Sequence, residues 1–255
     1  MGRVAETSTE LNEYERYLRL EELLALQSPA STDQAAAETL FITAHQACEL
    51  NFHALIATVA VLIDDMDIDN HGAAHARVLT VNALIKSVVA QTQTLNQLST
   101  PDFLDFRPLL GSASGFQSVQ FQTLQVLLAG TDEQGLANLT RAGAGINHKV
   151  RCVAASGRSI ADSLDRCRHR AMIGSWSNFL AGSVDHQAQT HPALRALILA
   201  LIDTDTLWFE WKAMHFNLVG RHLGFGTTGT GGTENSFLLK SLATRLFPTL
   251  WEPRT

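Results

Sequence analysis

The stretch Pro192–Leu223, PALRALILALIDTDTLWFEWKAMHFNLVGRHL, decides the fold class of this 255-residue chain. Pro192 suits the first turn of a helix, where the N–H that proline lacks has no partner anyway. A helix over this stretch, about 30 residues, is about 45 Å long. Its large apolar residues recur at helical spacing and share one broad face with a histidine: Leu201, Trp208, Trp211, His215, Leu218, Val219 and His222.

His215, flanked by large aromatic residues on this face, allows two interpretations. It is either a core histidine that hydrogen-bonds to a neighbour, or an axial imidazole for a flat apolar cofactor such as heme. The pattern alone leaves both open.

Most of the remaining chain also reads as helix between turn signals rich in glycine, serine and proline. Apolar residues near helical spacing predict a helix over Leu11–Gln27, and Ser31 with Gln34 predicts the cap of a long helix reaching about Ile63. Nothing alternates at period two for long enough to predict a strand. We therefore expect an all-α, single-domain helical bundle over residues 1–255.

The amino-acid composition argues against some classes of function and favours others. Apolar residues make up 45% of the chain and charged residues 17%, against the usual roughly 25% charged, so we expect a partner subunit or a buried cofactor to cover apolar surface. A net charge of −6 without a concentrated basic face argues against a nucleic-acid partner. The run Ala54–Ile63, apolar except for Thr58, is far shorter than the about 20 residues of a membrane span. We expect a cytoplasmic protein with no membrane partner.

Further segments carry candidate chemistry. His45 and Gln46 lie within an apolar helix stripe that contains Phe41, and such polar groups are costly to bury without a partner. Arg107, in the aromatic segment Asp102–Arg107, can fork onto the carboxylate of a small molecule or pair with Asp102 or Asp105.

Two loops also have sequences that resemble binding loops. Gly229–Thr233 is suited to closing over a ligand, although a plain surface loop fits equally. The run Asp65–Asp69 resembles the start of a calcium loop but lacks the required later residues, which predicts a solvated turn between helices.

Taken in order, these segments resemble the tryptophan 2,3-dioxygenase family within the heme-dependent aromatic oxygenases. The segments that carry the resemblance are Tyr14–Leu18, Leu40–Leu50, Asp105–Arg107, Ser114–Phe121, and His215 with Gly229–Thr233 and Leu246–Pro248. The resemblance implies an all-helical homotetramer, with a dimer left open, holding one heme b per subunit and using O₂ as co-substrate.

The family resemblance also implies roles for individual residues. His215 would be the axial ligand of the heme iron, and Ser114 and Gly115 would contact the cofactor. For substrate, the implied roles are a catalytic His45 near the indole N–H, Arg107 on the carboxylate, Thr230 on the ammonium group, and Phe41 and Phe103 as walls. Tyr14 and Tyr17 would reach into a neighbouring subunit's pocket.

The implied activity is oxygen insertion at indole C2 of L-tryptophan or of a ring- or β-substituted analogue, as in antibiotic pathways, to give an N-formylkynurenine. Asn51, His53 and Gln122 depart from the family pattern, and an apparent insertion at Thr227-Thr228 precedes Gly229. These departures leave three alternatives open: a reductant-dependent monooxygenase that forms an oxindole, a non-catalytic heme or indole sensor, and a heme-free bundle.

Overall fold

The computed structural model describes residues 12–131, 135–136, 147–182, 191–224, 239 and 241–254, which contain helices and no strand. Three long helices dominate: α3 (Ala35–Asp67), α4 (His71–Thr94) and α12 (Pro192–Leu223). The shorter elements are α1 (Glu13–Leu18), α2 (Leu20–Leu24), η1 (Leu95–Gln97), α5 (Thr100–Phe106), η2 (Arg107–Leu110), η3 (Gly115–Gln117), α6 (Val119–Ala129), α8 (His148–Ala155), α9 (Ile160–Arg170), α10 (Trp176–Ala181) and η4 (Pro248–Trp251). The predicted all-α fold is confirmed.

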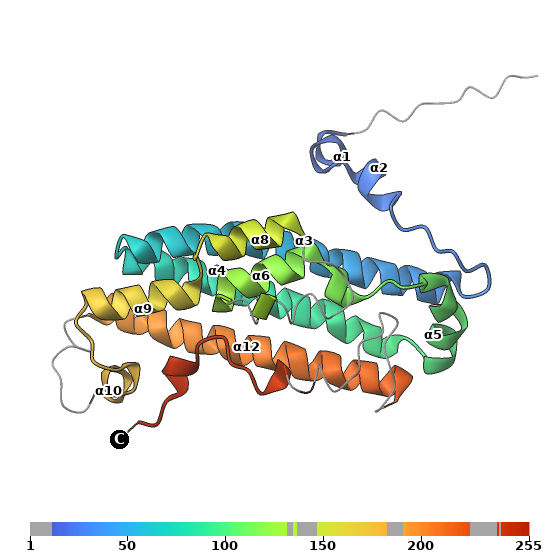
Figure 1. Cartoon of the computed structure of the whole chain (residues 1–255). Coiled ribbons are helices and arrows are strands. Elements are labelled where there is room, and N and C mark those ends of the chain that lie inside the picture. Colours follow the sequence, from blue (N-terminus) through green and yellow to red (C-terminus); the bar gives the residue numbers. More distant parts are fainter. Residues whose placement is uncertain are drawn as a thin grey trace, which may run out of the picture.

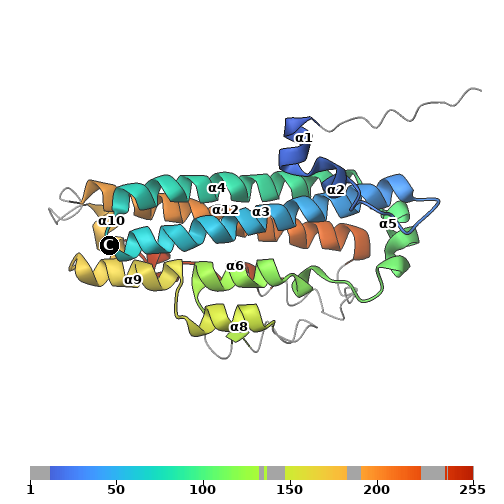
Figure 2. The ribbon, with the colours of Figure 1, turned by 90° about the horizontal axis from the view of Figure 1, so that it is seen from above.

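The three long helices run side by side, and shorter helices complete the bundle (Figures 1 and 2). Helices α6 and α9 pack along α3, and α8 lies outside α6. Helix α5 crosses one end of the bundle, beside the start of α3 and the end of α12. Helices α1 and α2 stand away from the bundle (Figure 1).

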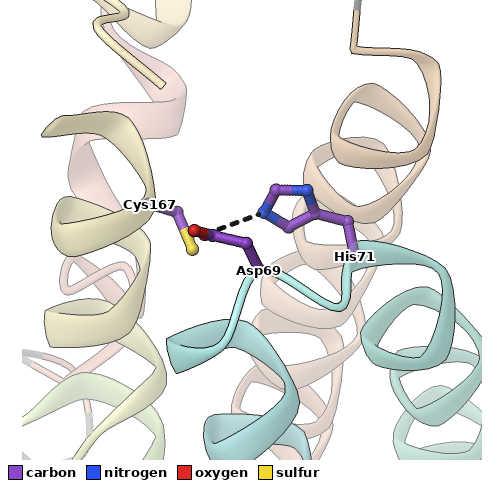
Figure 3. A group of neighbouring side chains, drawn as sticks. All are labelled: Asp69, His71 and Cys167. Carbon is purple, nitrogen blue, oxygen red and sulfur yellow. Dashed lines mark ion pairs between the residues drawn. The ribbon is translucent and has the colours of Figure 1, made fainter. Parts of the chain in front are cut away.

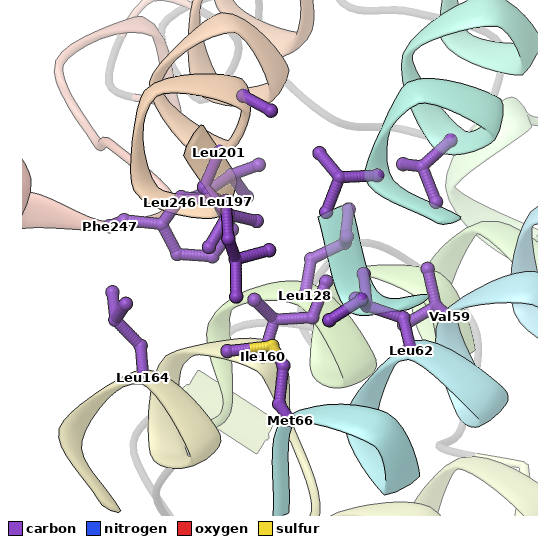
Figure 4. Packing of buried hydrophobic residues seen from close by; sticks show 14 of the residues in the cluster. Val59, Leu62, Met66, Leu128, Ile160, Leu164, Leu197, Leu201, Leu246 and Phe247 are labelled. Atoms are coloured by element: carbon purple, nitrogen blue, oxygen red, sulfur yellow. The ribbon is translucent and has the colours of Figure 1, made fainter. Parts of the chain in front are cut away.

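One large apolar cluster joins the long helices to α6, α9 and the C-terminal segment (Figure 4). Buried side chains meet there from each of these elements: Val59, Leu62 and Met66 of α3, Leu128 of α6, Ile160 and Leu164 of α9, Leu197 and Leu201 of α12, and Leu246 and Phe247. Each such side chain contributes about 1.5–3 kcal/mol by leaving water. This shared core fixes α3 relative to α12.

The helix predicted over Leu11–Gln27 is interrupted. Arg19 adopts the left-handed conformation with φ 53° and separates α1 from α2. The long second helix is confirmed, although it begins at Ala35 and continues to Asp67. The helix predicted from Pro192 to Leu223 is confirmed at both ends.

The turn predicted at Asp65–Asp69 is shorter than expected, since α3 continues to Asp67, and its carboxylates are not simply solvated. Asp65 pairs with Arg77 of α4, whereas Asp67 and Asp69 pair with Arg166 and Arg170 of α9. The prediction of a solvated turn was wrong in this respect, because the arginine partners lie far away in the sequence and the local pattern does not reveal them.

Helix α3 is long and apolar enough to cross a membrane by length and composition, and it is the one such helix among the described residues. Its buried apolar side chains, which include Leu55, Leu62 and Met66, lie in the large core cluster. The core helix of a bundle passes the same test of length and composition. The expected absence of a membrane partner stays a prediction.

Candidate functional site

His45 of α3 and His215 of α12 lie within electrostatic reach of each other, because a positive charge on His45 lowers the pKa of His215. One turn from His215, Leu218 packs in a cluster with Ala44 and Phe41 of α3. The large core fixes the positions of α3 and α12. This smaller cluster fixes the level along the helix axes at which His45 and His215 lie near each other.

The surroundings keep both imidazoles neutral at pH 7. Burial, with a smaller contribution from the His45 charge, lowers the pKa of His215 to about 4. Burial also lowers the pKa of His45, while the Phe41 carbonyl and Glu49 oppose that shift. His45 nevertheless keeps solvent-accessible surface.

His45 Nδ1 lies 2.7 Å from the carbonyl oxygen of Phe41, one turn earlier on α3. A carbonyl oxygen only accepts hydrogen bonds, so the neutral imidazole carries its proton on Nδ1 and donates it to Phe41. The Nε2 atom then keeps its lone pair. His45 is therefore arranged to accept a hydrogen bond from a ligand N–H.

An aromatic cluster adjoins His45 at the end of the bundle where α5 crosses. Ring centroids lie 4.1 Å apart for Phe41 and His45, 6.0 Å for Phe41 and Phe103, and 5.6 Å for Phe41 and Phe106. Offset and edge-to-face contacts of this kind are the favourable geometries for aromatic pairs. Phe103 is thus brought together with Phe41 and His45, which lie about sixty positions earlier in the sequence.

Two members of this cluster are not among the predicted site residues. Phe106 is fully buried, 5.5 Å from the Phe103 ring. His222 is 8% exposed, with its ring 5.1 Å from Phe103 and its Nδ1 3.4 Å from Thr100 Oγ1. The available signal was position, since His222 follows His215 by two turns on the same helix face.

Arg107 directly follows α5, at the start of η2. Its Nε atom is buried, so the guanidinium lies against the protein. Asp105, one of its two predicted alternative partners, accepts a hydrogen bond from Gln34 at 3.5 Å. The short α5 thus places a cation beside an aromatic wall, as an amino-acid carboxylate site requires.

The other predicted site residues lie outside this cluster. Ser114 caps η3, where its hydroxyl accepts from the Phe116 N–H at 3.4 Å and Gly115 begins the turn. Tyr14 and Tyr17 are exposed on α1, away from the bundle of their own chain (Figure 1). Thr230 and the rest of the predicted loop Gly229–Thr233 lie outside the described residues.

The three departures from the family pattern each find a partner in the described structure. Asn51 Nδ2 donates to the Ala47 carbonyl at 2.8 Å, and Gln122 Nε2 donates to the Phe116 carbonyl at 2.6 Å. The third, His53, lies with its Nδ1 3.2 Å from the Gln120 side-chain oxygen.

The residues present fit a heme. His215 offers a neutral imidazole, which is the form in which histidine usually binds metals. Its ring stacks on the Trp211 ring, with centroids 5.8 Å apart and an interplanar angle of 23°. Trp211 Nε1 in turn donates to Thr92 Oγ1 at 3.0 Å, which fixes the indole behind the ligand. Phe52 and Phe121 extend this apolar wall.

Comparison with known proteins gives consistent results. A family model described as tryptophan 2,3-dioxygenase matches residues 3–141. A protein named tryptophan 2,3-dioxygenase from Anaeromyxobacter sp. strain K is 32% identical over 261 residues, covering 94% of each chain. Proteins of the same name from Herpetosiphon aurantiacus and Nocardioides sp. are 29% and 31% identical, covering 94% and 95% of this chain and 96% and 93% of their own.

Proposed function

The chain belongs to the tryptophan 2,3-dioxygenase family, and from this premise we propose that it is a heme-dependent dioxygenase. It converts L-tryptophan, or an analogue substituted on the ring or β-carbon, into an N-formylkynurenine with O₂ as co-substrate. The observation that carries the proposal is the juxtaposition of neutral His45 and His215 beside the Phe41 and Phe103 wall. One heme b per chain and a single domain over residues 1–255 are parts of the proposal, as is a cytoplasmic location.

When bound, the heme supplies the activation of O₂, which protein side chains do not achieve by themselves. His215 would hold the iron through its free imidazole nitrogen, with Trp211 keeping the ring in place. Ser114 and Gly115 would contact the edge of the cofactor.

The chain's own groups bind and orient the substrate. Arg107 holds the carboxylate with its planar guanidinium, and Phe41 and Phe103 flank the indole. The Nε2 lone pair of His45 accepts the indole N–H, which orients the ring and leaves the proton on its nitrogen. Thr230 would contact the ammonium group.

Among the alternatives raised by the sequence, the dioxygenase has the support of the similar proteins, since the three compared above carry that name. None of these three is named a monooxygenase or a sensor. A heme-free bundle offers no reason for two neutral histidines placed near each other among aromatic side chains. The proposal therefore follows the family.

Turnover in ¹⁸O₂ tests the proposal. The purified protein is expected to show a heme Soret band and to form, from tryptophan without added reductant, a product carrying two ¹⁸O atoms. A product with one label that requires a reductant would contradict dioxygenation. A stable ferrous-oxy complex whose decay tryptophan does not accelerate would contradict enzymatic activity.

The matched variants are His215→Ala and His222→Ala. Loss of the Soret band only in His215→Ala assigns the iron ligand. Equal heme retention in the wild-type protein and in His215→Ala would refute the assignment. His222 serves as the comparison because it lies on the same helix face two turns away.

A further inference from the structure

The turn between α3 and α4 meets α9 at the end of the bundle opposite α5 (Figures 1 and 3). Asp69 and His71 from the turn region converge there on Cys167 of α9, and their potential ligand atoms all lie within 4.8 Å of one another. We propose that these three side chains bind a divalent transition metal ion, with zinc as the first candidate.

The donor set has the chemistry of a zinc site. It offers one sulfur, one imidazole nitrogen and one carboxylate oxygen, which are the three ligand types that Zn²⁺ takes in proteins. Bond lengths of about 2.0–2.3 Å in a tetrahedral site separate neighbouring ligand atoms by about 3.3–3.6 Å. His71 Nε2 and Asp69 Oδ1 already lie 3.4 Å apart, and the other ligand atoms, at most 4.8 Å apart, would have to approach by no more than about 1.5 Å to surround an ion.

The backbone holds the ligands in this arrangement before any ion binds. Asp69 adopts the left-handed conformation with φ 58°, which L-residues other than glycine adopt at an energetic cost. The His71 N–H donates to the Asp69 carbonyl at 2.9 Å. Asn70, the residue between them, is the N-cap of α4. The strained turn aims both side chains at α9.

The turn leaves a nitrogen without a hydrogen bond. His71 Nε2 is buried and has no hydrogen-bond partner, although a carboxylate oxygen lies 3.4 Å away. A buried nitrogen in this state is unfavourable. A metal ion between His71 and Asp69 would give this nitrogen a partner, while Asp69 already accepts hydrogen bonds from Arg170.

Arg170 lies next to the cluster and fits the outer shell of such a site. Its guanidinium donates to the two Asp69 oxygens at 2.8–3.0 Å and reaches Cys167 Sγ at 3.5 Å. Carboxylates that bind metals commonly accept outer hydrogen bonds of this kind. The negative charges of the Cys167 thiolate and the Asp69 carboxylate would balance the charge of a divalent ion. The positive Arg170 side chain would lie on the side of these two groups that faces away from the ion.

The proposed site is remote from the histidines of the oxygenase proposal. Asp69 follows His45 by twenty-four positions on or just beyond α3, which corresponds to about 36 Å along the helix axis. A metal at this end would therefore tie the α3–α4 turn to α9 and have no part in binding tryptophan.

The test uses the protein as purified with its heme, incubated with one equivalent of Zn²⁺, desalted and analysed for metal content. One zinc per chain is expected, and Cys167→Ser or His71→Asn is expected to weaken retention by roughly tenfold or more. Cys152→Ser is the matched control, since Cys152 is an exposed free cysteine on α8 and its loss should leave zinc retention unchanged.

Cobalt provides the independent readout of sulfur ligation. Co²⁺ should produce a sulfur-to-metal charge-transfer band in the wild type and in Cys152→Ser that is absent from Cys167→Ser. Failure of the wild type to retain zinc would overturn the proposal, as would an undiminished cobalt band in Cys167→Ser. Should Cys167→Ser not fold, His71→Asn carries the test through its zinc retention.

Discussion

At the scale of single residues, His215 must stay unprotonated for its nitrogen to serve as a ligand. Its pKa falls to about 4 in the folded chain from 6.5, so the unfolded chain binds this proton first as the pH drops. Stability from this residue is therefore full above pH 6.5 and is lost as the pH falls toward 4.

We expect heme-free wild-type protein to lose about 2–3 kcal/mol more stability between pH 7.5 and 4.5 than His215→Gln, which has no such proton to bind. Urea unfolding of both proteins at the two pH values measures the difference. Equal losses in the two proteins would show that His215 titrates normally in the folded chain.

Arg107 gives the second prediction at this scale. Removing a desolvated partner of a carboxylate costs about 2–4 kcal/mol, so Arg107→Ala should weaken tryptophan binding by roughly 30- to 1000-fold. Tryptamine, which lacks the carboxylate, is the matched ligand and should bind both proteins equally, as followed by changes in the heme spectrum. Equal weakening of both ligands would instead assign Arg107 to the support of the fold.

At the scale of elements, Asp205 joins the C-terminal segment to α12. This carboxylate is 1% exposed and accepts from the Leu246 and Phe247 backbone N–H groups at 3.1 and 3.2 Å and from Trp251 Nε1 at 2.8 Å. Asp205→Ala would leave these donors buried without a partner and should cost about 2–4 kcal/mol of stability.

Glu210→Ala is the control for this prediction, because Glu210 is exposed on the same helix and such a change usually stays within about 0.5 kcal/mol. Thermal unfolding measures the stability, and limited proteolysis followed by mass spectrometry reports release of the C-terminal segment. An Asp205→Ala protein as stable as Glu210→Ala would show that water replaces the carboxylate.

Some features of the helices could be predicted from the local sequence, and others could not. The start of α12 at Pro192 and the long α3 followed from proline placement and apolar periodicity, both of which act within one helix. The break at Arg19 did not, because Arg19 carries no turn signature. His222 behind Phe103 and the arginine partners of Asp67 and Asp69 depend on contacts between distant segments, which periodicity does not encode.

At the scale of the whole molecule, Tyr14 and Tyr17 are 67% and 88% exposed on helices that leave the bundle. We propose that they complete the site of a neighbouring subunit in a homotetramer. Two aromatic contacts of about 0.5–1.5 kcal/mol each imply that deleting residues 1–24 lowers kcat/KM by roughly 5- to 160-fold while heme is retained.

Mixing subunits decides whether the contact crosses between chains. The truncated chain keeps His215, and a full-length His215→Ala chain keeps Tyr14 and Tyr17, so co-refolded mixtures should be more active than the sum of the two variants alone. Native mass spectrometry of the same samples gives the number of subunits. Mixtures no more active than the sum of their parts would place the tyrosines on their own chain's site.

The length of α3 has a consequence for protein engineering. His45 and the turn at Asp69 share one helix but no side-chain partners, and substitutions so widely separated usually combine additively to within about 0.5 kcal/mol. The arginine–aspartate end can therefore be redesigned for heat resistance, with substrate preference altered independently at the Phe103 end. Libraries built separately at the two ends should recombine without losing the gains of either.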